Sequence, residues 1–84
     1  KDVSFRIVPL ERRDANEMIK EIKGYRLLQG YRGMAPVDIT YLENILLKIS
    51  DLVENNQFIK EMDLNPIFAY PDGASVIDAR IILK

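Results

Sequence analysis

The stretch from Asp38 to Asn56 carries the pattern that most limits how this chain can fold. Its apolar residues recur every three or four positions and lie on one side of a helix: Leu42, Ile45, Leu46, Ile49, Leu52 and Val53. Asp38 is a good N-cap, and Asn55 and Asn56 end the pattern. A helix with one apolar side must bury it, so the fold needs a second layer.

The remaining segments predict that second layer. Residues 3–9 alternate between apolar and polar and predict a strand ended by Pro9. Residues 11–23 predict an amphipathic helix with a solvated first turn at residues 11–14 and Gly24 as a C-cap at positive φ. Residues 24–38 contain three glycines and a proline and predict a loop. Strands are expected at about residues 59–69 and 75–83, around a tight turn at Asp72 and Gly73. The order strand, helix, helix, strand, strand predicts an α+β fold in which two helices cover one face of an antiparallel sheet.

The composition excludes several classes of function. The 84 residues allow at most one domain, and 12 basic against 13 acidic residues, without a basic stripe, disfavour nucleic-acid binding. The chain has no His and no Cys, so imidazole and thiolate chemistry are excluded. No apolar run approaches the roughly 20 residues of a membrane helix. The chain starts on Lys1 without a signal segment, so we expect a cytoplasmic protein or a piece cut from a longer one.

The predicted hairpin gathers oxygen-bearing side chains on one face of the sheet. A two-residue turn at Asp72 and Gly73 places Pro71 opposite Ala74 and Asn65 opposite Arg80. Strict alternation then gives one face with Asp63, Asn65, Ile67, Val76, Asp78 and Arg80, and a core face with Met62, Leu64, Phe68, Tyr70, Ile77, Ala79 and Ile81. Asn65 and Asp78 become diagonal neighbours about 7–8 Å apart. Pro66 lacks an N–H, which fits an edge or a bulge that could shift this register.

Two facing oxygen ligands are enough to suggest a magnesium site. Mg²⁺ binds oxygens at about 2.1 Å and commonly takes one or two from the protein, with water and phosphate completing the octahedron. Considered alone, however, an Asp-x-Asn pattern in a strand more often marks solvated polar residues on an exposed face. The pattern therefore leaves both interpretations open.

A wider set of motifs resembles a known family. The stretches "DVSFRIVPL", "LLQGYRG", "PVD" and "EMDLNPIFAYPDGASVIDARI" follow one another in this order along nearly the whole chain. Together they resemble the C-terminal part of the ATP-grasp domain of ADP-forming acyl-CoA synthetases, the family of ADP-forming acetate–CoA ligase. The beta chain of succinyl-CoA synthetase is a more distant relative of that family.

The resemblance implies roles for five residues. Asn65 and Asp78 match the positions that ligate the magnesium ion bridging the ATP phosphates. Asp63 matches the acidic position two residues before that Asn. Arg80 follows Asp78, at a position where many ATP-grasp enzymes place an Asn ligand instead. For Arg80 the resemblance therefore implies either a phosphate contact or a structural ion pair. For Arg32 of "GYRG", the resemblance implies a positive charge that contacts an anion.

The resemblance also implies a reaction. Such synthetases form an acyl phosphate and then the acyl-CoA, and relay the phosphoryl group through a histidine. The ATP-grasp domain passes this group between the phosphohistidine and ATP or ADP. Residues 1–84 would be the C-terminal segment of an incomplete domain. The rest of that domain and the CoA-binding domains would then lie in the same chain or in a partner subunit. The parent protein would be the enzyme, and this chain alone is not expected to be active.

Two alternatives stay open. The first is the related, synthetase-like domain of a protein acetyltransferase, which would sense ligand rather than turn it over. The second is a non-catalytic interaction module that uses the uncovered face of the sheet. The sequence of these 84 residues does not decide between them.

Overall fold

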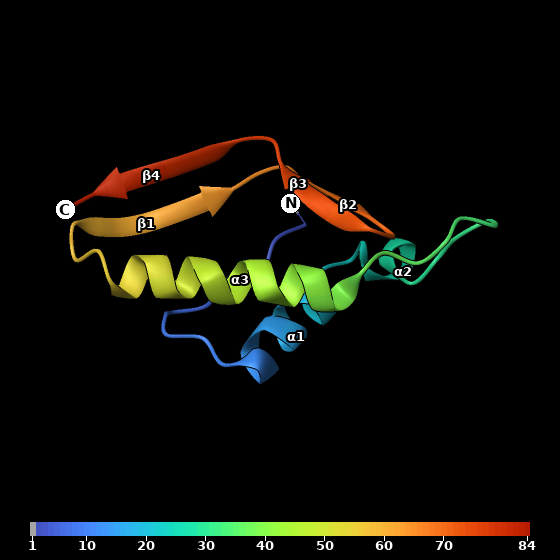
Figure 1. The fold of residues 1–84 in the computed structure, drawn as a ribbon, viewed down its shortest axis with the longest axis horizontal. Helices are drawn as coiled ribbons and strands as arrows, with labels where there is room; N and C mark the ends of the chain where they lie inside the picture. The colour runs from blue at the N-terminus through green and yellow to red at the C-terminus, as the bar shows by residue number, and fades with distance from the viewer. Residues whose placement is uncertain (1) are drawn as a thin grey trace.

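The computed structural model describes residues 2–84, which form helices below two short antiparallel sheets (Figure 1). The helices are α1 (Arg12–Glu21), α2 (Tyr25–Leu28) and α3 (Ile39–Glu54). The strands are β1 (Ile59–Leu64), β2 (Ile67–Tyr70), β3 (Gly73–Val76) and β4 (Ala79–Leu83). β1 pairs with β4, and β2 pairs with β3. Both long helices lie on the same side of the strands, and α1 packs on the side of α3 that faces away from them. The predicted α+β class is confirmed.

The helix predicted after Asp38 is confirmed with its cap. The Asp38 carboxylate accepts the N–H of Tyr41 at 2.9 Å, and Leu42 is buried one turn into the helix. The N–H of Asp38 donates to the carbonyl of Tyr70 at 3.1 Å. This bond fixes the start of α3 to the end of β2, so the long helix and the hairpin hold each other in position.

Polar side chains fill part of the contact between α1 and α3. Glu43, only 7% exposed, accepts the Arg12 guanidinium at 2.9 Å and the Asn16 amide at 2.8 Å. Ser50 is buried and accepts the N–H of Leu10 at 2.7 Å. Arg12 is exposed, as predicted for a solvated first turn, and its guanidinium also supplies the charged partner that the buried carboxylate on the facing helix needs.

Removing the buried carboxylate is expected to loosen α1 from α3. Glu43→Ala leaves Arg12 and Asn16 without their partner, which costs about 1–3 kcal/mol after allowing for the half-exposed Arg12 side chain. Backbone amides of α1 in the full-length protein should then exchange with deuterium roughly 5- to 150-fold faster. Glu54→Ala removes an exposed carboxylate from the same helix and is the matched control. Unchanged exchange in Glu43→Ala would show that this network adds no stability.

The chain before α1 is not the strand that its alternating pattern predicts. Residues 3–9 form no strand, and no backbone hydrogen bond joins residues 3–8 to other backbone groups between residues 2 and 84. Instead, Ser4 and Arg6 each hydrogen-bond the Glu21 carboxylate at the end of α1. A strand needs a partner edge to satisfy its backbone groups, and the described residues do not supply one here.

Gly24 also differs from its predicted role. Its φ is −72°, and it precedes α2 rather than capping α1 at positive φ. The Asp2 carboxylate accepts the N–H groups of Lys23 and Gly24, the latter at 2.7 Å. These side-chain bonds satisfy the chain where it leaves α1, so a left-handed residue is not required at this end.

The ion pair at Glu21 should be visible in its titration. Hydrogen bonds from Arg6 and then Ser4 lower the pKa of Glu21 from 4.5 to about 2. A carboxylate with a lowered pKa in the folded state contributes stability above pH 4.5, and that contribution is lost as the pH falls toward about 2. We expect a midpoint near 2 for the Glu21 carboxyl carbon by NMR of the ¹³C-glutamate-labelled full-length protein, assigned through Glu21→Gln. Arg6→Gln should raise that midpoint, and a wild-type midpoint near 4.5 would contradict the pairing.

The two long strands predicted after α3 are each broken in the middle. β1 and β2 are separated at Asn65 and Pro66, and β3 and β4 at Ile77 and Asp78. Pro66 has no N–H to donate, and its carbonyl accepts the N–H of Ile77 at 3.0 Å. Pro66 was predicted to mark an edge or a bulge that could shift the register. The structure instead shows a break between two sheets at Pro66, with the same register on both sides.

The turn of the hairpin lies one residue earlier than predicted. Tyr70 pairs with Gly73, so Pro71 and Asp72 are the two turn residues. A turn centred on Asp72 and Gly73 would need positive φ at both, yet Arg32 is the one non-glycine residue with positive φ between residues 2 and 84. Proline, with φ held near −65°, instead suits the first position of an ordinary turn. Partners consequently move by two residues, so Asp63 rather than Asn65 faces Arg80.

The predicted core face holds in β1 but not in β2. Met62 and Leu64 are half-buried in β1, whereas in β2 the half-buried residues are Ile67 and Ala69, and Phe68 and Tyr70 are exposed. The break at Pro66 interrupts the alternation, so the inward-facing positions change from even to odd numbers. Strict alternation across the whole strand was therefore the wrong assumption.

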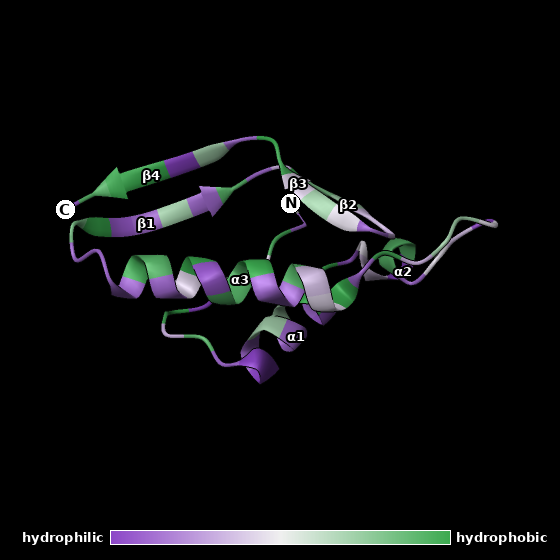
Figure 2. Cartoon of the chain, in the orientation of Figure 1, coloured by the Kyte–Doolittle hydropathy of each residue, from purple (hydrophilic) through white to green (hydrophobic). Residues whose placement is uncertain are grey.

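The packed core of the described residues is small. The buried apolar side chains are Ala15, Ile19 and Leu42, at the contact of α1 with α3. Large apolar side chains are exposed elsewhere, including Phe5, Met34, Phe58 and Leu83. Figure 2 shows one such apolar stretch toward the C-terminal end of β4. No helix formed between residues 2 and 84 has the length and hydropathy of a membrane span.

Candidate functional site

Asn65 and Asp78 lie opposite each other where the β1–β4 sheet meets the β2–β3 hairpin. The N–H of Asn65 donates to the carbonyl of Asp78 at 3.1 Å, and the next bond runs from Ile77 to Pro66. Both ladders continue this register on either side of the break. The two residues are therefore direct cross-strand partners, closer than the diagonal arrangement that the sequence predicted. The Cβ atoms of directly opposed residues in an antiparallel pair are about 4.5–5.5 Å apart.

Asp63 and Arg80 form a second facing pair, two residues along each chain from Asn65 and Asp78. They are direct partners in the β1–β4 ladder, and both are exposed. Neither takes part in an ion pair within residues 2–84, where the two salt bridges are Arg6–Glu21 and Arg12–Glu43. Of the two roles predicted for Arg80, the structural ion pair does not form within residues 2–84, and the phosphate contact stays a prediction.

The side-chain oxygens of Asn65 and Asp78 are free to bind a ligand. Both residues are exposed, and no side-chain hydrogen bond within the described residues involves either one. One carboxylate and one amide oxygen are hard donors of the kind that Mg²⁺ prefers. No group of three or more carboxylates in residues 2–84 is placed to enclose a metal ion. The donor set fits an ion that receives its other ligands from water or phosphate.

Arg32 lies apart from these four residues, in the loop between α2 and α3. Its φ is +50°, and it is flanked by Gly30 at +100° and Gly33 at +81°. A Cβ on Gly30 would lie 3.0 Å from the Met34 carbonyl oxygen, so this turn requires glycine. The guanidinium stacks 5.1 Å from the centre of the Tyr31 ring. This loop projects away from the strands (Figure 1), so the structure does not bring Arg32 to Asn65 and Asp78.

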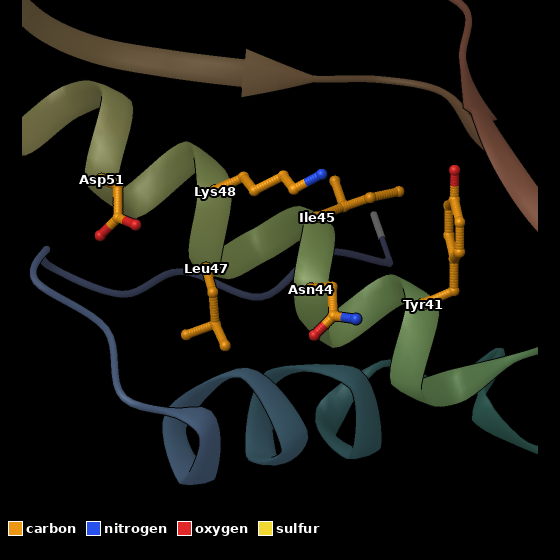
Figure 3. A pocket seen from close by; sticks show the side chains of 6 residues that line it. All are labelled: Tyr41, Asn44, Ile45, Leu47, Lys48 and Asp51. Carbon is orange, nitrogen blue, oxygen red and sulfur yellow. The ribbon is translucent and has the colours of Figure 1, made fainter.

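Two surface hollows lie elsewhere on the chain. One, of about 280 Å³, is lined by six residues of α3: Tyr41, Asn44, Ile45, Leu47, Lys48 and Asp51 (Figure 3). The other, of about 350 Å³, is formed by Arg32 with Leu27, Tyr31 and Met34. Asp63, Asn65, Asp78 and Arg80 line neither hollow, so the candidate ligands sit on an open strand surface.

The sequence signals did not identify every important polar residue. Glu43 and Ser50 sit in the α3 helix at positions that the periodic pattern treats as solvent-facing, yet both are buried. Glu43 bonds Arg12 and Asn16 of α1, and Ser50 bonds the N–H of Leu10 just before α1. Helical periodicity finds the widest apolar side of a helix and cannot find a second, polar side covered by another helix. Their contacts are structural, because they join α1 to α3 rather than to the strand surface.

Comparison with known proteins gives the relationship directly. Residues 1–83 match the family described as the ATP-grasp domain. The chain is 55% identical over 87 residues to the beta subunit of acetate–CoA ligase (ADP-forming) II from Pyrococcus furiosus, covering all of this chain and 37% of the relative. It is 53% identical over 83 residues to acetate–CoA ligase (ADP-forming) II from Archaeoglobus fulgidus, covering 99% of this chain and 12% of the relative.

A solved structure agrees in three dimensions. The dinucleotide-forming acetyl-coenzyme A synthetase 1 of Ca. Korarchaeum cryptofilum, in complex with coenzyme A and Mg-AMPPCP, superposes with a TM-score of 0.86. It is 53% identical to this chain, and the match covers 96% of this chain and 38% of that one. This chain thus spans 12–38% of the length of these three relatives. The resemblance predicted from the sequence motifs is confirmed, and the chain belongs to the ATP-grasp domain family, among relatives that are ADP-forming acetate–CoA ligases.

Proposed function

We propose that this chain is the C-terminal segment of the ATP-grasp domain of an ADP-forming acyl-CoA synthetase. In it, Asn65 and Asp78 supply oxygen ligands to the Mg²⁺ that bridges the nucleotide phosphates. The observation that carries the proposal is the direct opposition of these two residues, joined by the 3.1 Å bond from the Asn65 N–H to the Asp78 carbonyl. Two backbone hydrogen bonds across the break hold both ligands at one place on the surface.

The relatives support the nucleotide and the metal. The Korarchaeum synthetase is described with coenzyme A and Mg-AMPPCP, and with its phosphohistidine segment pointing toward the nucleotide binding site. This chain is 53% identical to that protein over 96% of its own length. We infer that the full-length protein binds ATP or ADP with Mg²⁺ and takes coenzyme A in its other domains. Those domains would lie in the same chain or in a partner subunit.

Each residue near the strand break has a simple task in phosphoryl transfer. When bound, Mg²⁺ neutralises charge on the phosphate oxygens, which is most of what such a site must provide. Asn65 and Asp78 fix where the ion sits relative to the strands. Arg80, free of a carboxylate partner among residues 2–84, can donate charge-assisted hydrogen bonds to a phosphoryl oxygen. We assign Asp63, its cross-strand partner, to orienting the nucleotide-binding surface, and Arg32 stays a predicted anion contact of the projecting loop.

The reaction of the full-length protein tests the proposal. With acetyl-CoA, ADP, orthophosphate and Mg²⁺ we expect acetate, CoA and ATP, and no ATP when Mg²⁺ is replaced by EDTA. A panel of other acyl-CoA thioesters then identifies the acyl substrate. Nucleotide binding without ATP formation from any thioester would instead favour the ligand-sensing domain of an acetyltransferase. Absence of both nucleotide binding and turnover would leave an interaction module and overturn the proposal.

A further inference from the structure

Residues 3–8 present two different faces to their surroundings. Ser4 and Arg6 face α1, where each donates a hydrogen bond of 2.8 Å to the Glu21 carboxylate. The alternate residues are exposed: Phe5 is 81% exposed and Ile7 is 92% exposed. This division by odd and even positions is the period of a β-strand, although no strand is formed. The segment is therefore held from one side and open on the other.

The open side is not free to turn into this chain's own core. Besides the Glu21 contacts, the Asp2 carboxylate binds the N–H groups of Lys23 and Gly24, the latter at 2.7 Å. These side chains attach the segment to the end of α1 at residues 2, 4 and 6. Turning Phe5 and Ile7 inward would break these contacts, since neighbouring residues of an extended chain point in opposite directions.

The backbone of this segment also lacks a partner strand, although the Phe5 carbonyl accepts a hydrogen bond from the guanidinium of neighbouring Arg6 at 2.8 Å. No backbone group of residues 3–8 bonds another backbone group within residues 2–84, and β1 to β4 pair only with one another. Unpaired strand edges beside large exposed apolar side chains are the features that take up an added strand. Phe5 and Ile7 would supply the alternate side chains that such pairing buries.

We propose that residues 3–8 form a strand that pairs with a β-strand of the full-length protein outside these 84 residues. The occupant is assigned from length: the chain covers 37% of the Pyrococcus beta subunit, so most of a comparable protein remains to cover this surface. The pairing strand must offer free N–H and C=O groups and apolar side chains against Phe5 and Ile7. The inference rests on the proposed membership in a larger domain but not on the metal site.

Cross-linking in the full-length protein tests the inference at adjacent positions. The photoreactive residue p-benzoylphenylalanine at position 5, replacing an aromatic side chain, should form cross-links to residues outside 1–84. The same residue at position 4 is the matched control and should cross-link to the end of α1, because Ser4 faces Glu21. Cross-links from position 5 only to residues within 1–84 would overturn the proposal.

Hydrogen exchange gives a second readout that needs no substitution. Amides of residues 5–8 in the full-length protein should exchange at least about tenfold more slowly than those of the exposed loop at residues 31–35, after correction for intrinsic rates. Exchange as fast as that loop would show that the segment is unpaired and would overturn the proposal. Either result leaves the magnesium site to be judged separately, through ATP formation by the variants at Asp78 and Asn65.

Discussion

Asp78→Ala in the full-length protein is expected to lower kcat/KM for ATP formation by about 10²–10³-fold. The substitution removes the one carboxylate of the proposed ligand pair, so the ion that neutralises the phosphates is held by the Asn65 amide alone. The concentration of Mg²⁺ needed for half-maximal rate should rise in parallel. Steady-state rates of ATP formation over a Mg²⁺ titration measure both effects, and Asn65→Ala should behave in the same direction.

The matched control for Asp78 is Glu61→Ala. Glu61 is an exposed carboxylate of β1, and it lies four residues from Asn65, about 13 Å along an extended strand. Its removal changes the net charge equally but should leave kcat/KM within about twofold. Equal losses in Glu61→Ala and Asp78→Ala would attribute the effect to surface charge. Full activity in Asp78→Ala and Asn65→Ala, with both proteins folded, would disprove the metal site.

Arg80→Ala is expected to have the second largest effect. Loss of a charge-assisted hydrogen bond to a phosphoryl oxygen costs about 1.5–3 kcal/mol, which corresponds to a fall in kcat of roughly 10- to 150-fold. The Mg²⁺ dependence should change little, because Arg80 is not a metal ligand. Arg80→Lys should recover part of the rate, since it keeps the charge but not the planar fork of donors. Arg13→Ala, at an exposed position of α1, is the control.

A double-mutant cycle separates this role from a structural ion pair. Asp63 is the direct cross-strand partner of Arg80 but forms no salt bridge with it. If Arg80 acts on phosphate, the double variant Asp63→Ala and Arg80→Ala should lose activity nearly as the sum of the two single effects. A double variant that loses clearly less activity than that sum would indicate that the two residues act as one pair, and the phosphate contact would be wrong.

The residues of the proposed ligand pair were identified from the sequence, although the way they face each other was not. Asp63, Asn65, Asp78 and Arg80 were identified from strand alternation and from motif resemblance. The structure pairs Asp63 with Arg80 in the β1–β4 ladder and joins Asn65 to Asp78 by a backbone hydrogen bond in the break beside it. The sequence placed the turn at Asp72 and Gly73 because this dipeptide favours tight hairpins. Pro71 occupies the first turn position instead, so Asn65 and Asp78 become direct rather than diagonal partners.

Residues 3–9 show a case in which the sequence pattern did not predict the local structure. Their alternation predicts a strand, but none forms within residues 2–84, because a strand exists only when another edge satisfies its backbone groups. Within residues 2–84 the segment is held to α1 through Arg6 and Ser4 instead. Arg12 and Glu43 illustrate the same dependence, because 31 positions separate them and no local pattern signals their contact.

The sequence by itself determined the features that depend on neighbours along the chain. These are α3 with its Asp38 cap, the extent of α1, the interruption at Pro66 and the identity of the oxygen-bearing residues, all governed by local periodicity and backbone chemistry. Only the tertiary structure decided which residues face each other: the register of the hairpin, the change of buried face after Pro66 and the polar contact of α1 with α3. Such pairings depend on distances between segments remote in sequence, and each is set by the packing of the whole chain rather than by any one stretch of it.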